Sequence, residues 1–224
     1  IHSHGAMDHD FSDGDGGAMD VLSAYYAANG VTSFLATTMT LKEPELTRAM
    51  LCVRESGLLL GARCAGVNLE GPFLSYAKRG AQNPDNLHRP AACMFERLDA
   101  ASGGAVRLVT VAPEVEGAGE FISQVSRHCA VSLGHTEADY ETARAAYSLG
   151  ASHATHLFNA MPPIHHRDTG VIGAAFDCGA TVELICDGLH VSPPAAVDHT
   201  HLRAHGPTGN HVRTPLPEHK NPRT

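Results

Sequence analysis

The feature that most constrains the fold of this chain is a regular alternation of short apolar runs with longer helix-like stretches. The apolar runs predict strands at residues 32–38, 65–69, 106–111, 130–133, 154–157 and 182–186. The stretches between them predict helices at residues 19–29, 43–56, 117–129 and 138–149. Strands that alternate with helices form βαβ units, whose strands are parallel and share one sheet.

Polar residues follow the predicted strands at their carboxyl ends. Glu70, His135 and His156 do so, as does the Asp-Gly-Leu-His turn at residues 187–190. Several strand ends that contribute to one site are typical of a (β/α)8 barrel. With a first strand ending at residues 2–4, the chain has about seven strand units, where a full barrel has about eight. The sequence therefore predicts an α/β fold over residues 1–197, an incomplete (β/α)8 TIM-type barrel that lacks the last strand.

Composition excludes some classes of function. Lys and Arg total 16 of 224 residues and the formal net charge is −8, which argues against non-specific nucleic-acid binding. A phosphorylated small molecule remains compatible, because one well-placed Arg can hold a phosphate. No apolar run is long enough to span a bilayer. The six cysteines form no C-x-x-C pair, so we expect buried free thiols in a reducing cytoplasm.

The two ends of the sequence depart from the barrel pattern. The chain opens at Ile1 without an initiator Met, and we expect a fragment or a trimmed product. Residues 198–224 contain five His and four Pro and no apolar run, whereas a final barrel strand is rich in Val, Ile and Leu. We expect this segment to be an aberrant, disordered tail, which a translation frameshift or an assembly error would explain.

Five of the polar residues are candidate metal ligands. His2 and His4 are two residues apart and would point to the same side of a strand, and Glu70, His135 and His156 each follow a later strand. Taken singly, each has a plain alternative as a surface histidine, a solvated Glu or a hydrogen-bonded structural histidine. Their recurrence at successive strand ends favours a metal centre. Imidazole and carboxylate suit Zn, Fe or Co, and the sequence does not choose among these metals or between one and two ions.

The segments around these residues resemble the N-acetylglucosamine-6-phosphate deacetylase family of the amidohydrolase superfamily. Each segment is weak alone, but together they are specific. They run in order from residue 1 to about residue 197 and read IHSHGAMDHDFSDGD, GVTSFLATTMT, GVNLEGPFLS, KRGAQNP, VTVAPE, VSLGHTEADY, ATHLFNAM and ELICDGLHV. The resemblance implies a TIM barrel with a small β-sandwich domain built from both chain ends, and we expect that domain to be missing here.

The resemblance also implies roles for individual residues. Glu70, His135 and His156 would bind one divalent metal, and in members that hold a second ion an H-x-H pair matching His2 and His4 binds it. Other members use a single metal. The implied contacts with the sugar phosphate come from Ala81, Gln82, Asn159, Ala160, Arg167, Asp187, Gly188, Leu189 and His190.

Arg167 and His190 have the most specific implied roles. A guanidinium pairs with phosphate oxygens in a bidentate way, so Arg167 is the expected phosphate anchor. Its alternative is a surface ion pair with Asp168. His190 is expected to hydrogen-bond the substrate at the acetyl carbonyl and to stabilise the developing oxyanion. Its alternative is a strand-end histidine bonded to the backbone.

The implied activity is metal-dependent hydrolysis of the acetamide of N-acetyl-D-glucosamine 6-phosphate to glucosamine 6-phosphate and acetate, by an enzyme that is commonly a homodimer. In the family one Asp after the eighth strand transfers both protons, and the matching stretch here, residues 210–214, has no Asp. We therefore identify no catalytic residue and expect the chain as given to be inactive or nearly so. Two rival functions remain, a non-catalytic metal-binding remnant and another amidohydrolase such as a dihydroorotase-like enzyme.

Overall fold

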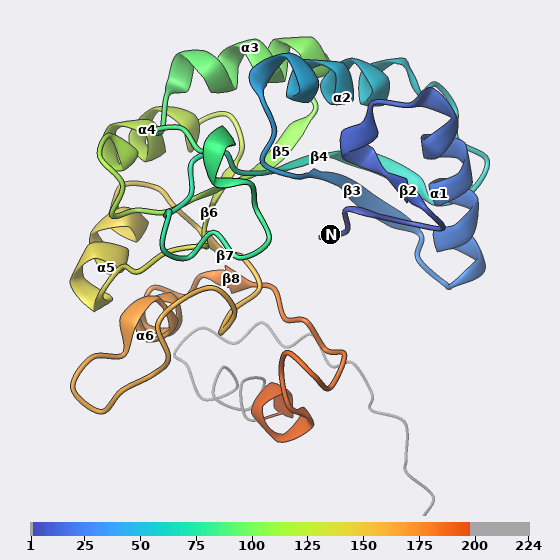
Figure 1. Cartoon of the computed structure of the whole chain (residues 1–224). Helices are drawn as coiled ribbons and strands as arrows, with labels where there is room; N and C mark the ends of the chain where they lie inside the picture. Colours follow the sequence, from blue (N-terminus) through green and yellow to red (C-terminus); the bar gives the residue numbers. More distant parts are fainter. Residues whose placement is uncertain (1, 198–224) are drawn as a thin grey trace, which may run out of the picture. The chain divides into compact units, whose positions relative to one another are not determined.

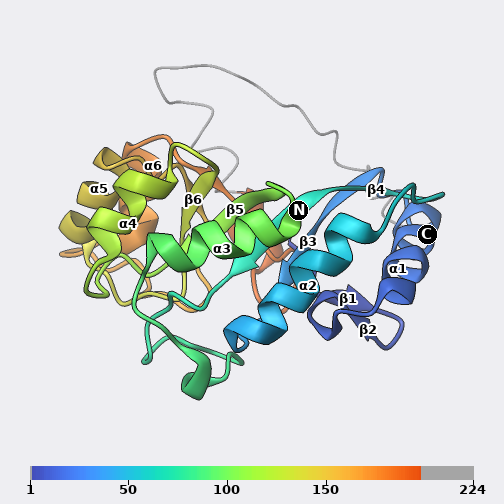
Figure 2. The same cartoon turned by 90° about the horizontal axis from the view of Figure 1, so that it is seen from above.

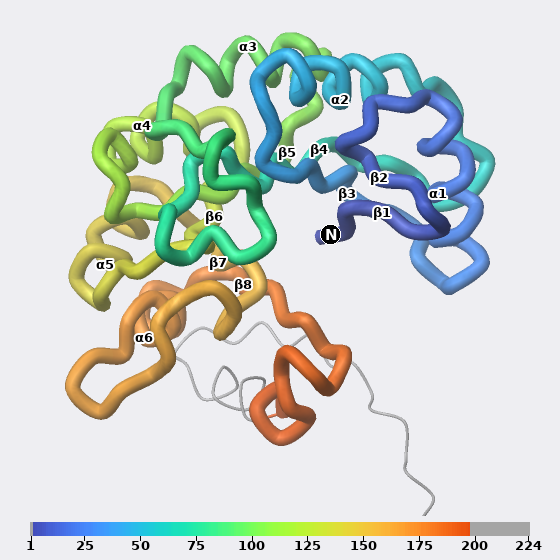
Figure 3. The backbone as a smooth tube through the Cα atoms, viewed as in Figure 1, coloured from blue at the N-terminus to red at the C-terminus, as the bar shows by residue number. Residues whose placement is uncertain are grey.

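The computed structural model describes residues 2–197, which divide between two compact units, Ile1–Ile185 and Cys186–Thr224. In the first unit, six parallel strands form one sheet whose strand order follows the sequence (Figure 1). The strands are β3 (Ser33–Thr38), β4 (Arg63–Glu70), β5 (Val106–Val111), β6 (Ala130–Leu133), β7 (His153–Ala154) and β8 (Thr181–Val182). The sheet is curled, and β3 and β8 lie at its two ends (Figure 3). This arrangement confirms the prediction of an α/β fold of the incomplete TIM-barrel type.

Helices cover the outer side of the curled sheet. In the view from above, α2 and α3 lie side by side across it (Figure 2). The α-helices are α1 (Gly16–Ala28), α2 (Glu43–Glu55), α3 (Ala92–Ser102), α4 (Ala118–Val125), α5 (Tyr140–Ser148) and α6 (Gly170–Asp177). Two 3₁₀ turns, η1 (Phe11–Asp13) and η2 (Pro84–Asn86), and a short antiparallel pair, β1 (Gly5–Ala6) with β2 (His9–Asp10), complete the described elements.

The period of the strands decides which side chains enter the core. Val67 and Leu69 of β4 are fully buried among the apolar residues that join the sheet to its helices. Asn68 and Glu70 alternate with them, and side chains two apart in a strand share a face. Glu70 therefore lies on the inner face of the sheet, at the carboxyl end of β4.

The segment before β1 takes the place of a further strand beside β3. Ser3 forms an isolated parallel bridge with Ala36, and the Thr37 amide donates to the Ser3 carbonyl at 3.1 Å. The Ser3 amide in turn donates to the Thr37 hydroxyl at 3.0 Å. These bonds hold the backbone between His2 and His4 against β3, the edge strand of the sheet.

Some predicted element bounds are wrong. The strands predicted at 154–157 and 182–186 end earlier, because His156 and Phe158 adopt positive φ angles of 31° and 78° that turn the chain out of the sheet. Because β7 has turned away, the segment after Glu183 has no strand among the described residues to pair with, and the predicted strand 182–186 ends early. Helices α3 and α6 were not predicted, and neither begins with a side-chain cap that the sequence would reveal.

Three further predictions concern features away from the sheet. All six thiols are free as predicted, but the prediction that they are buried is wrong: Cys52, Cys64 and Cys129 are half-buried, and Cys93, Cys178 and Cys186 are exposed. Over the described residues, no helix is long and apolar enough to cross a membrane. The predicted domain boundary at residue 197 coincides with the end of the described residues, and the predicted tail at 198–224 lies outside them.

Candidate metal centre

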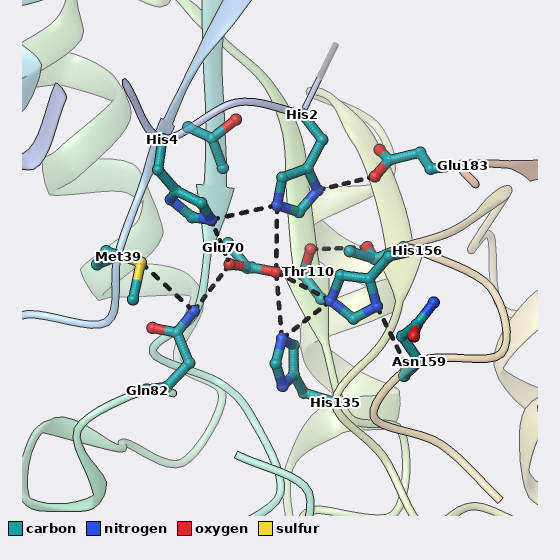
Figure 4. A network of polar contacts seen from close by, with 12 residues as sticks. His2, His4, Met39, Glu70, Gln82, Thr110, His135, His156, Asn159 and Glu183 are labelled. Carbon is teal, nitrogen blue, oxygen red and sulfur yellow. Dashed lines mark hydrogen bonds and ion pairs between the residues drawn. The ribbon is translucent and has the colours of Figure 1, made fainter. Parts of the chain in front are cut away.

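Five side chains from four separate segments meet at the carboxyl ends of the strands (Figure 4). Glu70 ends β4, His135 follows β6 by two residues, and His156 follows β7 by two residues. His2 and His4 come from the segment bound to β3. These are the five residues that the sequence predicted as metal ligands, and the fold brings all of them together.

The Glu70 carboxylate lies at the centre of the group. Its Oε1 is 3.2 Å from the Nε2 atoms of His135 and His156 and 3.4 Å from Nε2 of His2. Its Oε2 is 3.1 Å from Nε2 of His4. Glu70 is 2% exposed, so four imidazoles surround a carboxylate that has almost no contact with solvent.

The opposite ring nitrogens define which atom of each histidine faces the centre. His135 Nδ1 lies 2.8 Å from the Lys78 carbonyl, and His156 Nδ1 lies 3.1 Å from the Asn159 carbonyl. A carbonyl only accepts, so Nδ1 carries the proton in both rings and the Nε2 lone pair is free for a cation. This is the arrangement in which proteins hold metal-binding histidines.

Charges at the centre are strongly coupled. Burial disfavours ionised Glu70, but its polar contacts with His135, His156, His2 and His4 outweigh burial and hold the pKa of Glu70 well below its usual range. Burial likewise opposes a charge on His2, yet hydrogen bonds with Glu183 and Glu70 raise the pKa of His2 to about 9. The Glu70 carboxylate is therefore ionised at neutral pH, which is the state that a metal ligand requires.

The donor atoms fit a divalent metal. His135 and His156 have their Nε2 atoms 3.0 Å apart, and His2 and His4 have theirs 3.3 Å apart. Two nitrogens bound tetrahedrally to one zinc, at about 2.0–2.1 Å each, are about 3.3 Å apart. The residues form two groups, Glu70–His135–His156 and His2–His4–Glu70, in each of which the ligand atoms lie within 4.8 Å of one another. Glu70 is common to both groups, so its carboxylate could ligate a cation in either.

Gln82 orients the Glu70 carboxylate. Its amide nitrogen donates to Glu70 Oε2 at 2.8 Å, and its amide oxygen accepts from the Thr40 amide at 2.7 Å. Gln82 is 4% exposed. The sequence predicted a contact between Gln82 and substrate; in the structure its side chain contacts Glu70 and the Thr40 amide.

The backbone around the two inner histidines is strained. His135, His156, Phe158 and Ala160 have φ angles of 48°, 31°, 78° and 51°, in the region that residues with a Cβ rarely adopt. Such conformations persist where surrounding structure enforces them, and they cluster at functional sites. Here the Thr136 amide donates to the Ala160 carbonyl at 3.0 Å, which ties the loop after β6 to the loop after β7.

The remaining predicted substrate residues are placed less closely together. Asn159 and Ala160 lie in the His156 loop, half-buried, whereas Ala81 is exposed beside Gln82. Arg167 is exposed, in a pocket of about 510 Å³ that is also lined by Asp168. Among the described residues its guanidinium makes no ion pair, so the alternative pairing with Asp168 is not formed.

The turn at residues 187–190 belongs to the second unit. Asp187 Oδ1 accepts from the amides of Leu189 and His190, both at 2.8 Å, and its Oδ2 lies 2.6 Å from His190 Nδ1. Backbone and side-chain hydrogen bonds from His190 lower the pKa of Asp187 to about 2. Gly188 has a φ of 77°, which permits the tight turn.

Sequence reasoning missed two polar residues next to the centre. Glu183 follows β8 and lies 2.8 Å from His2 Nδ1, and His153 of β7 lies 3.3 Å from the same carboxylate. The rule that selected Glu70, a carboxylate directly after a strand, would also have selected Glu183. It failed because the apolar residues 184–186 extended the predicted strand past it.

Known proteins match this chain over most of its length. It is 39% identical to the N-acetylglucosamine-6-phosphate deacetylase of Bacillus subtilis over 88% of this chain and 51% of the relative. It is 35% identical to the N-acetylgalactosamine-6-phosphate deacetylase of Escherichia coli O157:H7 over 87% of this chain and 52% of the relative. The chain thus spans about half the length of the curated relatives it matches. No protein-family model matches it.

A solved structure gives the same result in three dimensions. The crystal structure of N-acetyl-D-glucosamine-6-phosphate deacetylase from Mycobacterium smegmatis matches with a TM-score of 0.82 and 35% identity, over 90% of this chain and 53% of that chain. With its curled parallel sheet and its His–Glu group at the strand ends, the chain is of the amidohydrolase class of TIM-type barrels. Within this class, the sequence matches and the structural match point to the same family. The chain belongs to the N-acetylglucosamine-6-phosphate deacetylase family.

Proposed function

We propose that this chain supplies the metal centre for hydrolysis of the acetamide of N-acetyl-D-glucosamine 6-phosphate to glucosamine 6-phosphate and acetate in the cytoplasm. One observation carries the proposal: four imidazole Nε2 atoms face one buried carboxylate at 3.1–3.4 Å. The proposed ligands are Glu70, His135 and His156 for one ion and His2, His4 and Glu70 for a second. A bound metal would polarise the amide carbonyl and lower the pKa of water to about 7.

The residues around the centre support this chemistry in distinct ways. Gln82 and the carbonyls of Lys78 and Asn159 hold the ligand atoms in place. We assign the phosphate to Arg167, whose guanidinium has no partner among the described residues, and the acetyl carbonyl to His190. The other predicted contacts at Ala81, Asn159, Ala160 and the 187–190 turn remain part of the proposal.

The substrate class comes from the relatives. One relative is named for N-acetylglucosamine 6-phosphate and another for N-acetylgalactosamine 6-phosphate, and a solved structure of a point variant holds the former compound. The two sugars differ only in the configuration at C4, away from the acetamide. We propose the gluco compound as substrate and treat the galacto compound as the nearest competitor.

The chain as given is expected to turn over slowly. Residues 210–214 offer no Asp for the two proton transfers, and loss of a general acid–base residue typically costs about 10²–10⁴-fold in rate. This absence favours a second candidate function, a metal-binding remnant without catalysis. The two candidates share the metal centre and differ only in product formation.

Metal content and acetate release together test the proposal. The chain would be dialysed against Zn²⁺, Co²⁺ or Fe²⁺, its bound metal measured, and acetate release followed with both sugar phosphates and with dihydroorotate. Bound metal with slow release from N-acetylglucosamine 6-phosphate supports the deacetylase, and bound metal without any release supports the remnant. Hydrolysis of dihydroorotate alone would contradict both, and a chain that binds no metal would overturn the proposed centre.

A further inference from the structure

Glu183 is a buried carboxylate that connects the last described strand to the first residues of the chain. Its amide donates to the Ala154 carbonyl at 3.0 Å and its carbonyl accepts from the Leu157 amide at 2.8 Å, so its backbone is held by the β7 segment. The residue is 9% exposed. It belongs to neither group of candidate ligands.

The side chain of Glu183 acts on the outer nitrogen of His2. Its Oε2 lies 2.8 Å from His2 Nδ1, on the side of the ring away from Glu70 (Figure 4). An ionised carboxylate only accepts, so His2 Nδ1 carries a proton, and Nε2, which faces Glu70 and His4, is the nitrogen that a metal would take. The contact thus selects both the tautomer and the direction of the ring.

The four histidines differ in what holds their outer nitrogens. His135 and His156 use backbone carbonyls, which no side-chain substitution removes. His4 Nδ1 is buried and has no hydrogen-bond partner among the described residues. His2 alone is held by a carboxylate from another segment. A carboxylate behind a ligand histidine raises the basicity of the ring as well as fixing it, and removal of such a group typically lowers metal affinity about 10–100-fold.

Glu183 also lies near His153, and this second contact helps to distinguish a role in orienting His2 from a role in linking β7 to β8. Its Oε1 lies 3.3 Å from His153 Nε2, in a geometry that satisfies neither atom as a hydrogen bond. If Glu183 only linked β7 to β8, its contact with His153 would matter and its contact with His2 would not. The shorter and better directed contact is the one with His2.

We propose that Glu183 is a positioning residue that orients His2 through Nδ1 and thereby builds the His2–His4–Glu70 position, leaving the Glu70–His135–His156 position independent of it. This inference rests on the proposed function, because it assumes that the centre holds divalent metal. It assigns to one carboxylate the control of how many ions the centre retains. The ion in the His2–His4–Glu70 position is the one that responds to Glu183.

Cobalt titration of the full chain tests the proposal. Co²⁺ binding would be followed at fixed pH by calorimetry and by visible absorption, which reports the ligand geometry around each ion. The variants are Glu183→Ala, the isosteric Glu183→Gln, His153→Ala, and the surface substitution Glu120→Gln on α4 as a matched control. Circular dichroism of each metal-free variant checks that it is folded.

The expected result is selective. Wild type takes two equivalents, Glu183→Ala weakens one of them about 10–100-fold with loss of its absorption band, and the other equivalent is unchanged. Glu183→Gln, which keeps an acceptor but no charge, shows a smaller loss in the same equivalent. His153→Ala and Glu120→Gln bind as wild type does.

Other outcomes overturn the inference in distinguishable ways. Two wild-type-like equivalents in Glu183→Ala, equal weakening of both, or the same loss in His153→Ala would each contradict a positioning role for Glu183. A single equivalent in wild type would show that there is no second position to build. A wild-type chain that takes no cobalt, zinc or iron would instead remove the proposed function on which the inference rests.

Discussion

At the scale of single residues, Glu70 is the group that the two candidate metal positions share. Replacing it with Gln keeps the volume and removes the charge that faces four imidazoles. We expect Glu70→Gln to lose both equivalents of metal, with affinity reduced by more than the roughly 10–100-fold that loss of an outer partner causes. Glu120→Gln, an exposed change on α4, is the control. Retention of either equivalent by Glu70→Gln, measured by metal analysis after dialysis, would show that Glu70 does not bridge.

Thiol reactivity gives a residue-scale prediction outside the centre. Burial raises the pKa of Cys129 to about 12, so this thiol is protonated at pH 8, whereas Cys93 and Cys178 are exposed. Because the thiolate is the nucleophile, we expect iodoacetamide to alkylate Cys93 and Cys178 well before Cys129. Peptide mass spectrometry over a time course measures the order, and unfolding in urea should abolish it. Early labelling of Cys129 in the folded chain would contradict the described burial.

The candidate ligands could be predicted from the sequence where local signals were strong. Glu70 and His135 follow strands whose apolar runs match the observed bounds closely, so their place at a strand end was readable. The place of Glu183 at a strand end could not be predicted, because the apolar residues 184–186 after it are typical of a continuing strand. β8 ends where it does because its partner strand, β7, is followed by a turn at His156 and offers no further backbone to pair with. This depends on tertiary structure and cannot be seen in the local sequence. The role of Gln82 was also out of reach, since its contact with Glu70 depends on how two loops meet.

At the scale of elements, the end of β6 depends on a glycine. A Cβ on Gly134 would lie 2.7 Å from Thr155 Cβ and 3.0 Å from Thr110 Cγ2, closer than packed carbons allow. We expect Gly134→Ala to reduce the free energy of unfolding by about 1–3 kcal/mol and to weaken metal binding by displacing His135. Gly119→Ala is the matched control, because there the new Cβ meets Leu149 at an ordinary 3.4 Å. Equal denaturant midpoints for the two variants would refute the packing argument.

Helices α2 and α3 are joined by an ion pair whose effect depends on pH. Arg97 Nε and Nη2 donate to the two oxygens of Glu43 at 2.6 and 3.0 Å, and the hydrogen bonding from Arg97 lowers the pKa of Glu43. A carboxyl whose pKa is lower in the folded state stabilises it at pH above the unfolded pKa, and this is lost as pH falls through the folded pKa. We expect Glu43→Gln to be less stable than wild type at pH 7 and equal to it in strong acid. Urea unfolding at a series of pH values measures this, and a difference independent of pH would contradict it.

At the scale of the whole molecule, metal binding links distant parts of the chain. The candidate ligands span residues 2–156, so an ion held by them binds the folded chain and not the unfolded one. Free metal at 100 times its Kd would stabilise the fold by about 2.7 kcal/mol. For a chain of this size each kcal/mol raises Tm by roughly 2–4 °C. We expect Zn²⁺ or Co²⁺ to raise Tm, and EDTA to reverse the rise. No rise in wild type would contradict the centre, and Glu70→Gln should show none.

The strand order has a consequence for how the chain is made. Because β3 to β8 pair in the order of synthesis, each new strand leaving the ribosome finds its neighbour already present at one edge. Chains grow at about 5–20 residues per second, so the sheet can lengthen strand by strand during translation. The two inner histidines arrive only after β6 and β7, and Glu183 arrives last. The Glu70–His135–His156 group is therefore complete only after the strands β3 to β7, which carry it, have been made.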